Sequence, residues 1–223
     1  MRIVTVLNQK GGVGKSNVVM NLAAVAAEHS RVLVADADHA QQTATSWAEA
    51  ADAAGKPLPY DFDAVDDPAV LAQLREFDEY DLILVDTPGS LAESELPRLN
   101  ALLDASDFVI LPIEPKFNSV RPLVTTLTTL VQPRELPYRV LMSRVHRDEP
   151  GQKRRDEMAA TLDEMELPRF QSVIREYTAH ADAPIDGDVV TNYAASRGAT
   201  NALDDFKSLA LELNTLWANG GSK

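Results

Sequence analysis

The chain has 223 residues, a length that fits one α/β domain with a continuous buried core. It contains no cysteine, which excludes disulfides, thiolate metal sites and iron–sulfur clusters. Its formal net charge of −13 at pH 7 argues against a uniformly basic surface of the kind that binds nucleic acid.

Short runs of β-branched and other apolar residues alternate with segments of helical period, which predicts a mostly parallel, doubly wound α/β sheet flanked by helices. Strands are predicted at residues 3–7, 32–35, 60–65, 82–85, 108–112, 138–143 and 170–174. Helices are predicted at about 15–29, 40–54, 68–77, 93–103, 120–131, 154–166 and 200–217. We expect a single domain over residues 1–218 and a disordered tail at 219–223.

The first apolar run, residues 3–7, is too short for a signal peptide, and no segment of the sequence is long enough to span a bilayer. Met1 lies directly before this run, so we expect no additional N-terminal domain. The sequence therefore predicts a cytoplasmic protein.

A glycine-rich turn, Lys10-Gly11-Gly12-Val13-Gly14-Lys15-Ser16, follows the first strand and precedes a helix. Such a turn aims backbone N–H groups and the positive end of the helix dipole at one point, which suits a phosphate. Lys15 is predicted to reach the β- and γ-phosphates, and the Ser16 hydroxyl to bind Mg²⁺. Gln9 stands where the ordinary P-loop has glycine, and Lys10 is a second lysine where one suffices.

The strand predicted at 32–35 leads into two carboxylates, Asp36 and Asp38, with one residue between them. Acids two apart on a strand point to the same face, so both are expected near the phosphate loop. The alternative is that both acids cap the helix that follows.

The strand predicted at 82–85 delivers Asp86 to the same edge of the sheet, followed by Thr87-Pro88-Gly89. This is the Walker B arrangement, in which the acid holds a Mg²⁺-bound water. A strand-terminal aspartate that caps the next turn is the alternative.

Five cations are candidates for a surface that contacts the DNA backbone. Between Arg134 and Arg175, nine Lys and Arg stand against eight Asp and Glu, whereas the rest of the chain has twelve against twenty-six. Lys153, Arg154 and Arg155 open a predicted helix, where the dipole disfavours cations, and such a conflict suggests a function. Arg175 and Arg197 are further candidates. An ordinary solvated face is the alternative.

The C-terminal helical segment places Phe206, Leu209 and Leu213 on one face, and its other face is acidic. We therefore predict that it packs in the core and does not target a membrane. The four histidines form no metal-ligand spacing and are predicted to lie at the surface.

The K-G-G-x-G-K-S loop, the D-x-D element and the Walker B aspartate resemble, in order and spacing, the deviant Walker A ATPases of the ParA/MinD group. The resemblance covers nearly the whole chain and implies a ParA-type partition ATPase with a P-loop fold that uses ATP/ADP and Mg²⁺. It implies that Lys10 reaches the phosphates of the partner subunit and that Asp38 orients the attacking water. Mg²⁺ would be held by Ser16 and Asp86 with support from Asp36.

The resemblance also implies contacts with the rest of the nucleotide. The phosphates would be held by Gly11, Gly12, Val13, Gly14, Lys15, Ser16 and Asn17. Relatives usually have a second hydroxyl where Asn17 stands, so its amide must replace the α-phosphate contact. Ser143 and Arg144 occupy the position where relatives often carry Asn-Arg beside adenine, and an ordinary strand-end cation is the alternative for Arg144.

The implied cycle is an ATP-dependent homodimer that binds DNA nonspecifically until a ParB-type centromere-binding partner stimulates slow hydrolysis. No membrane contact is expected, and DNA binding would associate the protein with the nucleoid. Related nitrogenase iron proteins are excluded because they need cysteine ligands. A MinD-like membrane ATPase remains an alternative, as does an amidoligase of the cobyrinic acid synthetase type, although the latter lacks a cysteine nucleophile.

Overall fold

A seven-stranded parallel sheet forms the centre of the computed structural model, which describes residues 1–65 and 67–220. The strand order is β3-β2-β4-β1-β5-β6-β7, with every pair parallel. The strands are β1 (Arg2–Val6), β2 (Val32–Asp36), β3 (Asp61–Ala64), β4 (Leu82–Asp86), β5 (Phe108–Ile113), β6 (Tyr138–Val145) and β7 (Arg169–Arg175). All seven predicted strands are therefore confirmed, as is the fold class.

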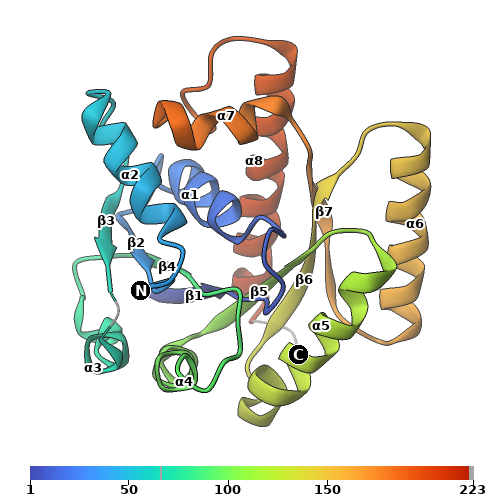
Figure 1. The fold of residues 1–223 in the computed structure, drawn as a ribbon, viewed down its shortest axis with the longest axis horizontal. Helices are drawn as coiled ribbons and strands as arrows, with labels where there is room; N and C mark the ends of the chain where they lie inside the picture. Colours follow the sequence, from blue (N-terminus) through green and yellow to red (C-terminus); the bar gives the residue numbers. More distant parts are fainter. Residues whose placement is uncertain (66, 221–223) are drawn as a thin grey trace.

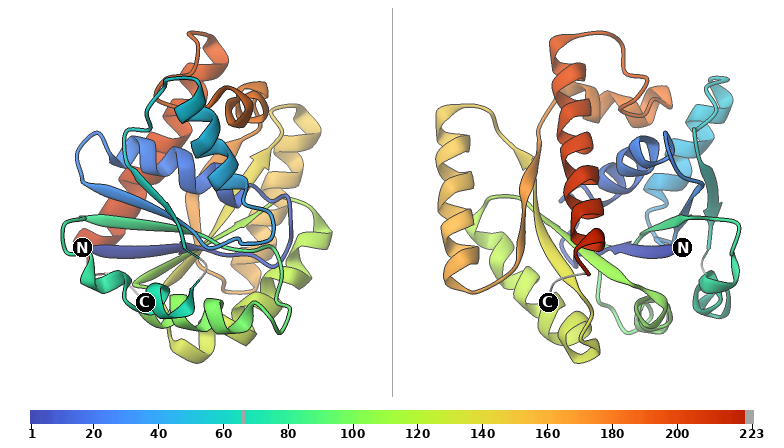
Figure 2. Two further views of the ribbon diagram at one scale, coloured as in Figure 1. Left: turned by 60° about the vertical axis from the view of Figure 1, so that its left-hand side comes forward. Right: turned by 180° about the vertical axis from the view of Figure 1, so that it is seen from behind.

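Helices cover both faces of this twisted sheet (Figures 1 and 2). One layer contains α1 (Lys15–Ala26), α2 (Thr43–Ala53), α7 (Thr178–Asp186) and α8 (Arg197–Ala218). The other contains α3 (Pro68–Ala72), α4 (Leu96–Ala105), α5 (Val120–Thr126) and α6 (Glu149–Glu164). A π-helical stretch, Leu127–Val131, extends α5.

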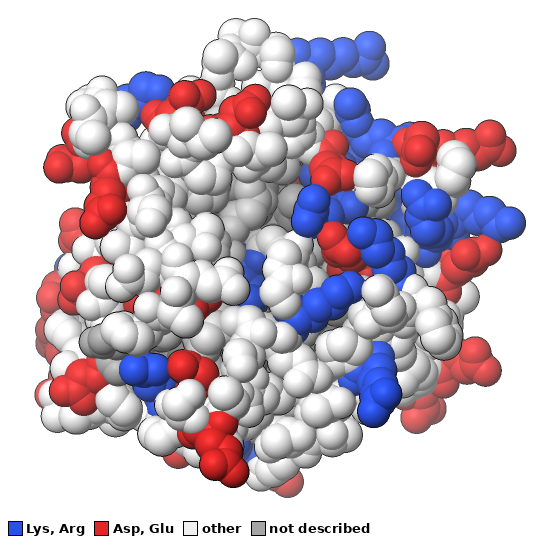
Figure 3. Space-filling view, viewed as in Figure 1, with Lys and Arg blue, Asp and Glu red and all other residues white. Residues whose placement is uncertain are grey.

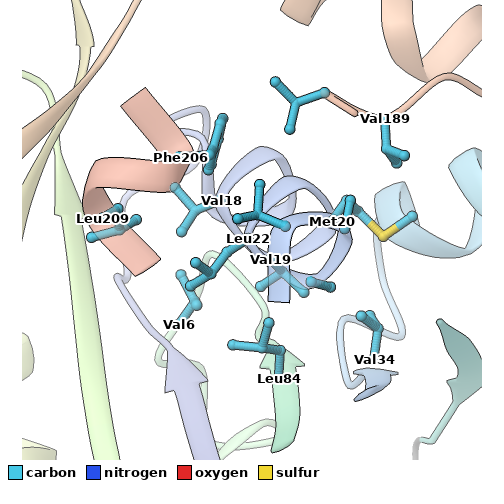
Figure 4. Close-up of a cluster of buried hydrophobic side chains, with 14 of the residues drawn as sticks. Val6, Val18, Val19, Met20, Leu22, Val34, Leu84, Val189, Phe206 and Leu209 are labelled. Atoms are coloured by element: carbon cyan, nitrogen blue, oxygen red, sulfur yellow. The ribbon is translucent and has the colours of Figure 1, made fainter. Parts of the chain in front are cut away.

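The alternation of side chains along β1 explains how one strand serves two cores. Val4 and Val6 pack in the cluster around α1 and α8, whereas Ile3 packs in the cluster beneath α3 and α4. Figure 4 shows Val6 facing α1, and Phe206 of α8 packed against the same helix near Val18. Because α1 is buried on nearly all sides, the loop that precedes it is firmly positioned.

α8 belongs to this core, as predicted, because Phe206, Leu209 and Leu213 are at most 2% exposed. Within the described part of the chain, no helix has the length and apolar character needed to cross a membrane. Of the tail predicted to be disordered, Asn219 caps α8, and residues 221–223 lie outside the described residues.

Helix α7 was not predicted. It is short and contains Pro184, which breaks the helical pattern in the sequence. It ends at Gly187, whose φ of +68° and close approach to α2 both require glycine, since a Cβ there would lie 2.3 Å from the Cα of Ala51. This contact packs α7 against α2.

The two edges of the sheet differ. At one edge, β3 carries Asp61 and Asp63, both exposed. At the other, β7 lies against α8, whose Glu212 accepts hydrogen bonds from the backbone N–H groups of Gln171 and Ser172 at 2.8 and 2.9 Å.

Candidate nucleotide site

The loop between β1 and α1 has the backbone form of a phosphate cradle. Gly12 and Gly14 have φ angles of +75° and +87°, in the left-handed region that favours glycine. The first turn of α1, Lys15-Ser16-Asn17, contains no acid, so its amide groups and dipole favour an anion. Gln9 explains the departure from the ordinary P-loop, because its side chain donates to the Pro122 carbonyl at 2.9 Å and ties the loop to α5.

Lys15, at the end of this loop, is buried, with only 8% of its surface exposed. Burial lowers the pKa of its ammonium group, while the charges of Asp86 and Asp38 act to raise it. The loop after β4 approaches from the other side, since a Cβ on Gly89 would lie 3.3 Å from Lys15 Nζ. The ammonium group is thus fixed beside the predicted phosphate position.

The three predicted acids converge at the carboxyl ends of β2 and β4. The register pairs Asp36 with Asp86, and Asp36, Asp38 and Asp86 are 4%, 5% and 1% exposed. Asp36 accepts from the N–H of Asp38 at 2.9 Å and from the N–H and hydroxyl of Thr45 at 2.9 and 2.7 Å. Asp38 accepts from the N–H of Gln41 at 3.0 Å. These bonds fix the loop and delay the start of α2 from the predicted residue 40 to Thr43.

Among the described residues, five buried side-chain polar atoms have no hydrogen-bond partner. Two of them belong to predicted site residues, Oδ2 of Asp86 and the side-chain nitrogen of Asn17. Burial raises the pKa of Asp86 to about 7, although the nearby Ser16 hydroxyl acts to lower it. An unpaired acceptor suits a cation, and an unpaired donor suits a phosphate oxygen. Because each unpaired group costs on the order of 1–3 kcal/mol, a Mg²⁺–nucleotide complex would relieve both.

The residues present also fit the way in which Mg²⁺ is held. Within residues 1–65 and 67–220, no group of three or more His, Asp or Glu side chains is arranged to bind a metal. Mg²⁺ usually keeps several waters and binds through one or two protein oxygens plus substrate phosphates. Asp86 and the Ser16 hydroxyl suit that mode, with Asp36 in a supporting position beside Asp86.

Lys10, at the start of the loop, is bound by its own chain. Its Nζ donates to Oγ of Ser119 at 3.1 Å and to Oδ1 of Asn118 at 3.2 Å. The carboxylate of Glu114, which is 8% exposed, lies 3.9 Å away and also pairs with Lys116 at 2.8 Å. The cross-subunit role predicted for Lys10 therefore requires its side chain to leave these contacts.

Ser143 and Arg144, predicted to lie near adenine, both contact the phosphate loop. The Ser143 hydroxyl donates to the Val13 carbonyl at 2.6 Å, and the Arg144 guanidinium donates to the Gly12 carbonyl at 2.9 Å. Arg144 has a φ of +53° and pairs with Glu176 at 3.0 Å. Their contact with adenine stays a prediction.

A cavity of about 280 Å³ is lined by the phosphate loop, Ser143 and Arg144 on one side and by residues from β7 and α7 on the other. This second wall, which includes Tyr177, His180 and Pro184, was not predicted from the sequence. The alanine-rich run before Gly187 was the available signal, since glycine often follows a helix C-terminus.

The prediction that all four histidines lie at the surface was wrong for His180. Its ring packs edge-on against the rings of Tyr177, Tyr193 and Phe206, and its Nδ1 lies 3.0 Å from the Tyr193 hydroxyl. Burial lowers the pKa of this histidine to about 4. It is therefore neutral near pH 7.

The prediction that Lys153, Arg154 and Arg155 open a helix was also wrong. α6 begins earlier, at Glu149, because the Asp148 side chain caps it by accepting from the N–H of Gly151 at 2.9 Å. The three cations lie beyond the first turn, where the dipole effect has decayed. The conflict with the dipole falls instead on Arg197, the first residue of α8.

Figure 3 shows Lys and Arg side chains gathered over the side of the molecule that carries α6, whereas Asp and Glu predominate around α2 and β3. Lys153 and Arg154 on α6 and Arg197 on α8 are exposed. Arg155 pairs with Asp156 at 2.7 Å. Arg175 binds the buried Asp205, so its charge is largely neutralised.

Comparison with known proteins gives the family of the chain. Residues 4–190 match the family described as the CobQ/CobB/MinD/ParA nucleotide binding domain. The chain is 37% identical over 216 residues to a maintenance of carboxysome distribution protein A from Gloeobacter kilaueensis, covering 97% of this chain and 95% of that protein. It is 30% identical over 161 residues to the chromosome-partitioning ATPase Soj from Thermus thermophilus, covering 60% and 63% of the two chains.

Among solved structures, the septum site-determining protein MinD from Pyrococcus horikoshii, complexed with Mg-ADP, has the same fold. The TM-score is 0.74 at 21% identity, with 96% of each chain covered.

Proposed function

The chain belongs to the CobQ/CobB/MinD/ParA nucleotide-binding family, and from this membership we propose that it is an ATP-driven positioning ATPase of the ParA/MinD type. Two copies that have bound ATP and Mg²⁺ form a sandwich dimer, the dimer binds DNA without sequence preference, and slow hydrolysis releases it. The observation that carries this proposal is that two predicted site residues each have a buried atom without a partner, an acceptor on Asp86 and a donor on Asn17, while Lys15 is itself buried.

Each residue of the site has a role in this proposal. Lys15 and the loop amides bind and orient the phosphates, and Asn17 donates to a phosphate oxygen. Asp86 and Ser16 hold Mg²⁺, which neutralises phosphate charge when bound. Asp38, fixed by the N–H of Gln41, orients a water for attack, and this positioning is the main contribution that a protein makes to phosphoryl transfer.

The cargo follows from the relatives. A relative that matches almost the full length of the chain is named for carboxysome distribution, so we propose a large protein assembly as the cargo. A protein bound to that assembly then takes the part of the ParB-type partner and stimulates hydrolysis. Association with the nucleoid follows from DNA binding by the dimer.

DNA binding depends on a local basic face, because the whole chain is strongly acidic. A dimer carries two such basic faces and therefore binds DNA more strongly than a monomer. Because the dimer forms with ATP, DNA binding depends on ATP as well. The exposed cations Arg154 and Arg197 support this role, whereas Lys153, Arg155 and Arg175 contribute less because each is paired with a carboxylate. The apolar face of α8 is buried, which disfavours the alternative of membrane binding.

Cosedimentation with DNA and with liposomes, each with ATP, ADP or no nucleotide, tests the proposal. We expect DNA binding only with ATP, and a steep loss of binding as salt increases. Arg154→Glu with Arg155→Glu should weaken DNA binding while basal ATPase activity is kept. The matched control, Arg31→Glu with Lys207→Glu, changes the net charge equally on other elements and should bind DNA normally. Binding to liposomes alone would favour the MinD-like alternative.

A further inference from the structure

Phe117 is an exposed aromatic residue beside the phosphate loop. It begins the short turn Phe117–Ser119 that follows β5, and it is 93% exposed. Isolated apolar residues at a surface are common. Nearly complete exposure of an aromatic ring still leaves a large hydrophobic gain for any partner that covers it.

The neighbours of Phe117 connect it to Lys10. The next two residues of the turn, Asn118 and Ser119, accept hydrogen bonds from Lys10 Nζ. On the other side, Lys116 pairs with Glu114, and its side chain is 51% exposed. Gly11 and Gly12 of the phosphate loop are also exposed. These neighbouring residues form one patch, which consists of the cations Lys10 and Lys116, the exposed glycines Gly11 and Gly12, and the ring of Phe117.

We propose that Phe117 is the apolar anchor of the contact between two nucleotide-bound copies of this chain. The inference rests on the proposed dimer: the turn at 117–119 lies within hydrogen-bond distance of Lys10 in the free chain, so a second copy close enough for Lys10 to reach its nucleotide also meets this turn. The charges agree, since Lys10 and Lys116 would face a partner whose bound nucleotide is negative. A two-fold interface uses the patch twice, so each dimer buries two Phe117 rings.

Two other exposed apolar residues serve as contrasts. Ile185 on α7 is 79% exposed and Leu211 on α8 is 69% exposed. Leu211 lines a hollow between α8 and the C-terminal part of α1, formed by residues other than those of the phosphate loop. Leu211→Ala is therefore a matched control that removes similar apolar surface elsewhere.

The test measures dimer affinity by sedimentation equilibrium with Mg²⁺ and AMPPNP, which prevents hydrolysis. Phe117→Ala should weaken the dimer roughly a hundred-fold, about ten-fold for each ring lost. Binding of a fluorescent ATP analogue to the monomer should not change, because the ring does not line the nucleotide cavity. Phe117→Leu should retain most of the affinity, and Leu211→Ala all of it.

Several results would overturn the proposal. One is a Phe117→Ala variant that dimerises like the wild type, and another is an equal weakening by Leu211→Ala. Loss of DNA binding by Phe117→Ala with an unchanged dimer would assign the ring to nucleic acid instead. If the wild type itself stays monomeric with AMPPNP although it binds the analogue, the proposed dimer fails and the anchor fails with it. A dimer that forms independently of Phe117 overturns the anchor alone.

Discussion

Lys15 and Lys10 stand at the two ends of one loop, yet their surroundings are opposite. Lys15 is buried among acids and lies near polar atoms that have no partner, whereas Lys10 is partly exposed and bound by Glu114, Asn118 and Ser119. The first region is incomplete without a ligand. The second has temporary partners within its own chain. We infer that the inner region binds nucleotide, and that the outer region must exchange partners before two copies assemble.

The largest effect is expected at the inner lysine. Lys15→Ala should abolish nucleotide binding, because a triphosphate loses its main charge-assisted partner, a loss of about 3 kcal/mol or more and so at least roughly a hundred-fold in affinity. Isothermal titration with ATP and Mg²⁺ measures this. Wild-type affinity in the variant would remove the phosphate-loop assignment and with it the difference between the two regions.

At the outer lysine, Lys10→Ala should leave ATP binding to the monomer largely intact and eliminate the ATP-dependent dimer and hydrolysis. ATP binding should be kept because Lys10 contacts the turn after β5 and not the inner cavity. The dimer should be lost because no side chain at position 10 would reach the nucleotide of the partner subunit. Size-exclusion chromatography with ATP gives the oligomeric state. Lys207→Ala, which removes an exposed cation on α8 outside this patch, is the control, and an undiminished dimer in Lys10→Ala would contradict the cross-subunit role.

A smaller effect in the opposite direction is expected from Glu114→Gln. The substitution weakens the hold on Lys10 within its own chain, so dimer affinity should rise about two- to five-fold, as for loss of a partly exposed ion pair. Glu114 also pairs with Arg144 at 3.3 Å. Glu176→Gln, which removes the other carboxylate that pairs with Arg144, is therefore the control and should not strengthen the dimer.

The final prediction concerns pH and the wall of the inner cavity. The pKa of His180 is lowered to about 4, so on acidification the unfolded chain takes up a proton near pH 6.5, before the folded chain does. The contribution of His180 to the free energy of unfolding is therefore complete above pH 6.5 and falls as pH decreases toward 4, by about 2 kcal/mol at pH 5. The raised pKa of Asp86 acts in the opposite direction over the same range, so the contribution of His180 is measured as a difference between two proteins. Urea unfolding of the wild type and of His180→Phe at pH 7 and 5 gives that difference. On going from pH 7 to 5, His180→Phe should lose less stability than the wild type, and an equal change in both proteins would assign the pH dependence to other groups.

The sequence was sufficient to predict the sheet and the residues that meet at its edge. Buried parallel strands are continuous apolar runs, and Asp36 and Asp86 follow two of them directly, so their meeting needed no tertiary information. The start of α6 was missed because a single side chain, Asp148, sets it. α7 was missed because its packing depends on the contact of Gly187 with Ala51. The partners of Lys10 lie more than a hundred residues away, and spacing along the chain carries no information about them.

The acidic edge strand restricts how copies of this protein associate. Neighbouring sheets can join by strand addition when an edge is flat and uncharged, and such joining leads to open-ended polymers. Asp61 and Asp63 on β3 would bring like charges together in any such pairing, and α8 lies against β7 at the opposite edge. Association is thereby directed to the loops at the carboxyl ends of the strands, where the proposed pair would close and growth would stop at two.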